Sequence, residues 1–74
     1  MKKIKDGKLY DTTKSIIVAM SQATLYKTKK GNFFTYTGNT QEIEPLDKKE
    51  ALLWCEASNI DVEVIMKYFR IEEA

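Results

Sequence analysis

The fold is decided by one stretch, residues 25–38, which reads LYKTKKGNFFTYTG. Aromatic and β-branched side chains, which favour strands, lie on both sides of the short segment Lys29-Lys30-Gly31-Asn32. Gly31 can adopt the positive φ that a tight hairpin loop requires, and Asn32 tolerates the neighbouring geometry. The stretch therefore predicts a β-hairpin with arms at residues 23–28 and 33–37.

Further strands are expected on both sides of this hairpin. Residues 8–11 follow an Asp6-Gly7 turn signal, and residues 15–20 are rich in β-branched side chains and indicate a buried strand. A turn at Gly38-Asn39 leads to a short, charged strand at residues 41–44. Because consecutive strands usually lie side by side, we predict an antiparallel β-meander of four to five short strands.

Two short helices are predicted after the β half. Asp47 and Glu50 have the spacing of a capping box, in which each side chain accepts a hydrogen bond from the backbone amide of the other. This helix is expected to stop near Asn59, and Asp61 is expected to cap the next one. The second helix has apolar residues at helical spacing on one predicted stripe: Val62, Ile65, Met66 and Phe69. Val64, Tyr68 and Ile71 widen this stripe.

The chain is therefore predicted to form one α+β domain over residues 1–74, with a β half at about 8–44 and a helical half at about 46–70. A domain of 74 residues is stable by a narrow margin and often depends on disulfides, metals or self-association. Cys55 is the one cysteine and there is no histidine, so we expect no internal disulfide, no metal site and no cofactor. Self-association is the remaining route.

No arrangement of residues predicts catalysis. There is no histidine to act as a base at neutral pH, no serine or cysteine beside an evident base, and no phosphate-binding glycine loop. Cys55 is interpreted as a small buried hydrophobe, and Trp54 as a side chain that fills the core between sheet and helices. We therefore expect a protein that is not an enzyme and has neither catalytic residues nor a small-molecule substrate.

Charge is distributed unevenly along the chain. Residues 1–40 contain eight lysines and two aspartates, whereas residues 41–74 contain four basic and nine acidic residues. A nucleic-acid partner, attraction between copies, and an ordinary solvated surface are all compatible with this polarity. The apolar run at residues 16–20 is too short for a signal-peptide core or a membrane span. Together with the single cysteine, this predicts a cytoplasmic protein that does not contact membranes.

The hairpin has more large apolar side chains than one face of a sheet can hide. A three-residue loop places Tyr26 opposite Phe34 on one face and Leu25 with Phe33 on the other, and a two-residue loop shifts this pairing. Either register leaves rings on both faces, and two short helices can cover only one. The other face must be closed by the first strands of the chain, be closed by another molecule, or be left to bind a ligand. The rings of the outer face are expected to pair across strands, to contact another protein chain, or to stack on bases.

We therefore predict a small non-enzymatic interaction or regulatory module that binds a protein partner or itself through the outer face of the 23–37 hairpin. The alternative is nucleic-acid binding, in which rings of the same surface stack on bases and lysines contact phosphates. A helix-turn-helix is less favoured, because Asp61 and Glu63 would repel DNA phosphates. The predicted interaction residues are Tyr26, Lys27, Lys29, Lys30, Phe33 and Tyr36.

Four motifs together resemble a group of small uncharacterised bacterial proteins that occur among phage, plasmid and transposon cargo. The blocks are KLYDT at residues 8–12, LYKTKKGNFF at 25–34, IxPL at 43–46 and EAxxW at 50–54. Many members have a longer segment between the first two blocks, so this chain is a compact version. The resemblance implies a bacterial, intracellular protein with an accessory or regulatory role on a mobile element, and it transfers no catalytic residue or cofactor.

Overall fold

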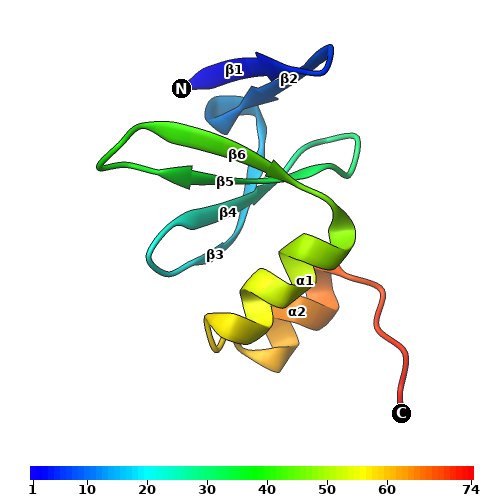
Figure 1. The fold of residues 1–74 in the computed structure, drawn as a ribbon. Coiled ribbons are helices and arrows are strands. Elements are labelled where there is room, and N and C mark those ends of the chain that lie inside the picture. Colours follow the sequence, from blue (N-terminus) through cyan, green and yellow to red (C-terminus); the bar gives the residue numbers. More distant parts are fainter.

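The computed structural model describes residues 1–74. A four-stranded antiparallel sheet lies between an N-terminal β-hairpin on one side and two helices on the other (Figure 1). The elements in chain order are β1 (Lys2–Lys5), β2 (Lys8–Asp11), the 3-10 helix η1 (Thr12–Lys14), β3 (Ile16–Met20), β4 (Thr24–Lys27), β5 (Phe33–Thr37), β6 (Glu42–Leu46), α1 (Lys48–Ala57) and α2 (Val62–Tyr68).

The predicted α+β class and antiparallel meander are confirmed. The order in the sheet is β3-β4-β5-β6, with every strand beside its neighbour in sequence. Strand β2 does not join this sheet, because it pairs with β1, a strand that the lysine-rich residues 2–5 did not signal. The turn between them places Asp6 at φ 52° and Gly7 at φ 75°, the conformation that Asp-Gly favours in two-residue hairpin loops.

The central hairpin adopts the three-residue register. Tyr26 pairs with Phe34 and Lys27 pairs with Phe33. The amide of Thr28 donates to the carbonyl of Asn32 at 2.8 Å, so the loop proper is Lys29-Lys30-Gly31. Gly31 has φ +88°, which is accessible to glycine at little cost and explains why this position closes the turn.

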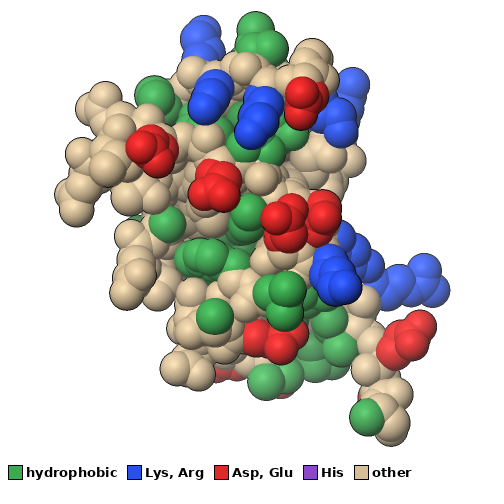
Figure 2. Space-filling view, in the orientation of Figure 1, with side chains coloured by type: hydrophobic (Ala, Val, Ile, Leu, Met, Phe, Trp, Pro, Cys, Tyr) green, Lys and Arg blue, Asp and Glu red, His purple; other side chains and the backbone are tan.

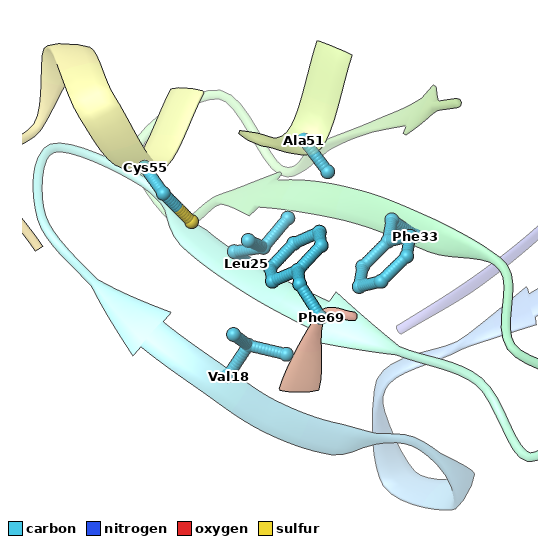
Figure 3. Close-up of a cluster of buried hydrophobic side chains, with 6 residues drawn as sticks. All are labelled: Val18, Leu25, Phe33, Ala51, Cys55 and Phe69. Atoms are coloured by element: carbon cyan, nitrogen blue, oxygen red, sulfur yellow. The ribbon is translucent and has the colours of Figure 1, made fainter. Parts of the chain in front are cut away.

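A core lies on each side of the sheet. On the helix side, six buried side chains from both halves of the chain meet (Figure 3): Val18, Leu25, Phe33, Ala51, Cys55 and Phe69. On the outer side, Tyr10 from β2 closes over Phe34 and Ile43. The N-terminal hairpin therefore covers part of the outer face of the sheet, as the helices cover the inner face.

Helix α1 begins and ends as its sequence predicts. The Glu50 amide donates to Asp47 Oδ1 at 2.7 Å, and the Asp47 amide donates to Glu50 Oε1 at 3.0 Å, which completes the capping box. Asn59 follows the helix with φ 54°, the left-handed conformation common after helices. Trp54 is half-buried and packs against the helix-side core. Neither α1 nor α2 has the length and apolar character needed to cross a membrane.

The predicted stripe on α2 is wrong for two of its four residues. Val62 and Met66 are 64% and 57% exposed, and Ile71, predicted to widen the stripe, is 45% exposed. The other predicted members, Val64, Ile65 and Tyr68, do pack against the core. The cause lies outside the helix. Ile60 before it also packs on the core, and the chain leaves the helix at Phe69, which is extended (φ −128°, ψ 147°) and buried. These two anchors, rather than the apolar periodicity, set the rotation of this two-turn helix.

Candidate binding surfaces

The six predicted interaction residues do not share one surface. They divide into three pairs with different surroundings. The half-buried rings of Tyr26 and Tyr36 lie on the outer face. Lys27 and Phe33 lie on the helix-facing side. The exposed Lys29 and Lys30 occupy the turn.

Phe33 and Lys27 belong to the structural core rather than to an outer face. Phe33 is 4% exposed and stacks on Phe69 with ring centroids 4.7 Å apart. Lys27 of β4 is paired with Phe33 of the neighbouring strand β5, and its Nζ lies 5.6 Å from the centroid of the Phe33 ring. The same ammonium group donates a hydrogen bond to the Tyr68 carbonyl at 3.2 Å. Tyr68 is the last residue of α2, and a cation at this end of a helix pairs with its free carbonyl groups. Because Phe33 is buried, the prediction that it lies on the outer face and contacts a partner is corrected.

The rings of the outer face largely cover one another. Phe34 has no exposed surface, because Tyr26 stacks on it at 5.0 Å with nearly parallel planes and Tyr10 meets it edge-on at 5.6 Å. Closure of this face by the first strands was one of the expected alternatives, but Tyr10 itself was not singled out as the residue that provides it. No local signal identifies Tyr10, since its role depends on β2 crossing over the sheet.

Exposed apolar side chains line the β3 edge of the sheet. Ile16, Ile17 and Met20 are 53%, 49% and 69% exposed. Ile17 is paired with Tyr26 and therefore extends the outer face. The prediction that residues 15–20 form a buried strand holds only for Val18, which a β-bulge between residues 17 and 19 directs into the helix-side core.

The other edge of the sheet, strand β6, has a different character. Glu42 and Glu44 are exposed, and Pro45 removes one backbone donor. Strand β1 lies near β6, as helix α2 lies near β3. Charges and proline are usual means by which a protein prevents pairing at a strand edge. Strand β3, in contrast, contains no charged residue and no proline.

A second candidate surface is a hollow between the N-terminal hairpin, η1 and the β4–β5 turn. It has a volume of about 350 Å³ and ten lining residues, of which only Leu9 is apolar. Four of the ten are lysines: Lys8, Lys14, Lys29 and Lys30. An adjoining hollow of about 610 Å³ shares Lys14 and Lys29 and adds Lys27. In Figure 2, basic side chains gather over β1 and β2, whereas acidic ones lie over β6 and the start of α1.

Asp11 is the one acidic residue that lines this hollow. Its Oδ1 accepts hydrogen bonds from the Thr13 amide at 3.0 Å and the Thr13 hydroxyl at 2.8 Å. The Ser15 hydroxyl donates to the Asp11 carbonyl at 2.8 Å, which holds η1 in place. These bonds from Thr13, the hydroxyl first, lower the pKa of Asp11, with a smaller contribution from Lys14. These hydrogen bonds therefore favour the ionised form of the Asp11 carboxylate.

The structure offers no other chemically specialised site. No group of three or more histidine, cysteine, aspartate or glutamate side chains is placed to hold a metal ion. Cys55 is fully buried, and burial, assisted by the charge of Glu56, raises the pKa of its thiol. A protonated, enclosed thiol is a poor nucleophile, so Cys55 serves as a core residue.

In comparisons with known proteins, no family model, no curated protein and no solved structure matches this chain.

Proposed function

We propose that this protein is a small non-enzymatic interaction module that associates with a second copy of itself through the free edge of β3. One observation carries this proposal: β3 presents an edge without charge or proline, whereas β6 at the opposite edge of the sheet has two exposed glutamates and a proline. An apolar strand edge without such residues invites pairing with another chain. Of the predicted interaction residues, Tyr26 stays in this surface, beside Ile17.

The character of the strand favours a second copy as the occupant. Two copies related by a two-fold axis present the same strand to each other. In an antiparallel pairing, the uncharged strand Ile16–Met20 of one copy lies beside the same strand of the other. A parallel pairing would set Lys14 against Lys14 and is disfavoured. The antiparallel arrangement joins two four-stranded sheets into one.

The alternative, nucleic-acid binding through the ring face, has less support at this surface. Phe33 and Phe34 are buried, so base stacking would depend on Tyr26 and Tyr36, which are themselves half-buried. The lysines of the turn line a separate hollow and do not interleave with these rings. The resemblance to proteins of bacterial mobile elements is our reason for placing the module in a bacterial cytoplasm, in an accessory or regulatory role.

The test is the mass of the protein in solution, measured by sedimentation equilibrium from about 1 μM to about 1 mM, the range over which weak to moderate interfaces become populated. We expect the mass to rise from 8.6 kDa toward twice that value. Because the contact is apolar, added salt should not weaken it. Replacing Ile17 with lysine should keep the protein monomeric, since two copies would then bury like charges.

The matched control is Leu53→Lys, which adds the same charge at a similarly exposed position of α1 (55% against 49% for Ile17). This variant should associate as the wild type does. Hydrogen exchange should show new protection in residues 16–20 at high concentration. A wild-type protein that remains at 8.6 kDa throughout, or an Ile17→Lys variant that still dimerises, contradicts the proposal.

A further inference from the structure

We propose that the lysine-lined hollow beside the β4–β5 turn binds the phosphate groups of a nucleic-acid strand. The site is distinct from the β3 edge and does not depend on the dimer. It retains Lys29 and Lys30 from the residues that the sequence analysis selected, and it adds Lys8 and Lys14 from the N-terminal segment.

The lining of the hollow has an excess of positive charge. Four ammonium groups line it against one carboxylate, that of Asp11, whose Oδ1 accepts hydrogen bonds from Thr13. Of the lysines around the two adjoining hollows, Lys27 alone donates a side-chain hydrogen bond within the chain. A concave surface with an excess of one sign of charge concentrates counter-ions of the opposite sign, and lysine is a common phosphate ligand.

Two residues with neutral hydrogen-bond donors, Thr28 and Asn32, also line the hollow. Thr28 Oγ1 accepts a hydrogen bond from the Asn32 amide at 3.0 Å, which leaves the hydroxyl proton of Thr28 to donate elsewhere. The side-chain amide of Asn32 lines the same hollow. A hydroxyl and an amide set among ammonium groups match the oxygens of a phosphodiester, which accept from both kinds of donor.

The shape of the surface indicates a strand of phosphates. The hollow of about 350 Å³ continues into the neighbouring one of about 610 Å³ through Lys14, Ser15, Thr28 and Lys29, which line both. The two form an open track rather than an enclosed pocket. No aromatic side chain lines either hollow, so the contacts are to the backbone and carry no base specificity. A flat bilayer surface would touch only the rim of this track.

The size of the effect follows from counter-ion release. With four lysine–phosphate contacts, log K should fall with log salt at a slope of about −3.6 on duplex DNA and about −2.8 on a single strand. Between about 50 and 200 mM salt, the duplex slope corresponds to a loss of affinity of roughly 150-fold. Each lysine removed should reduce the slope by about 0.9.

The experiment measures the fluorescence anisotropy of labelled 20-nucleotide single-stranded and 20-base-pair duplex probes against the intact protein, at several salt concentrations. Lys29→Glu/Lys30→Glu should weaken binding at least tenfold and reduce the duplex slope by about 1.8. Lys48→Glu/Lys49→Glu is the matched control. It makes the same change in net charge at two exposed positions in the first turn of α1, where acidic residues are compatible with the helix.

Circular dichroism should show both variants folded, and the Ile17→Lys variant should bind the probes as the wild type does. Inorganic phosphate at millimolar concentration should compete weakly, which separates a strand-binding track from a site for the free ion. Three results would overturn the proposal: no binding at low salt, equal losses in the two charge variants, or retention on anionic vesicles without retention on oligonucleotides.

Discussion

The N-terminal hairpin should contribute a large part of the stability of the whole domain, and Tyr10→Ala tests this directly. Tyr10 is 7% exposed and is the residue through which β2 closes the outer face. Its ring meets Phe34 edge-on at 5.6 Å. Without this ring, Phe34 and Ile43 become accessible to water and the hairpin loses its main attachment to the sheet.

The expected cost combines two terms. Burying a side chain of this size is worth about 1.5–3 kcal/mol, and an edge-to-face aromatic pair adds about 0.5–1.5 kcal/mol. The loss should therefore be roughly 2–4 kcal/mol, consistent with the range for large-to-small changes of buried rings. A domain of 74 residues has a total stability of roughly 4–11 kcal/mol, so this substitution consumes a substantial share of it. The melting temperature should fall by about 10–30 °C.

Urea unfolding followed by far-ultraviolet circular dichroism measures this change. Leu9→Ala is the control, since Leu9 is adjacent in β2, points to the other side and is 50% exposed. It should cost less than about 1 kcal/mol. Tyr10→Phe keeps the ring and should behave much like the wild type. If Tyr10→Ala is no more destabilising than Leu9→Ala, the hairpin does not seal the outer core and the two-core description is wrong.

Three further predictions concern single residues. Cys55→Ser should lower the free energy of unfolding by about 1–3 kcal/mol in urea titrations, because it buries a hydroxyl among apolar side chains, and the native thiol should react with Ellman's reagent only on unfolding. Gly31→Ala should cost about 1–2 kcal/mol by thermal unfolding, since φ is +88° there. The pKa of Asp11 is lower in the folded protein than in the unfolded chain, so its ionised carboxylate stabilises the fold. This stabilisation is fully present above the unfolded-state pKa and is lost as the pH falls through the folded-state pKa. The stability difference between wild type and Asp11→Asn should therefore be present at pH 7 and close in strong acid; a difference independent of pH would contradict this.

Features encoded by neighbouring residues were predictable from the sequence. The central hairpin follows from Gly31 and from the strand-forming residues on both sides of it, whereas its register, which the sequence left open between a two-residue and a three-residue loop, comes from the structure. The capping box of α1 follows from the spacing of Asp47 and Glu50. Each depends on backbone geometry over fewer than about five residues, a range in which local hydrogen bonds and φ preferences act directly.

Features set by distant contacts were not predictable in this way. Residues 2–5 have three lysines and no strand signal, yet they pair with β2 because the Asp6-Gly7 turn reverses the chain. The rotation of α2 depends on Ile60 and Phe69, which lie outside the helix and are anchored in the core. In both cases tertiary packing outweighs a weak local preference.

The division of the predicted site has the same origin. The pairing of β4 with β5 places Lys27 and Phe33 on a common face, but the sequence of the hairpin does not say which face the helices cover. Once α1 and α2 occupy that face, the rings of the hairpin become structural, and the surface that remains is defined by what the N-terminal hairpin leaves uncovered. Tyr10 closes the part over Phe34, and Ile17 stays accessible at the β3 edge. The same hairpin brings Lys8 toward the turn lysines. The position of residues 2–11 over the sheet thus determines both candidate surfaces at once, which is why neither could be identified from the 23–37 hairpin alone.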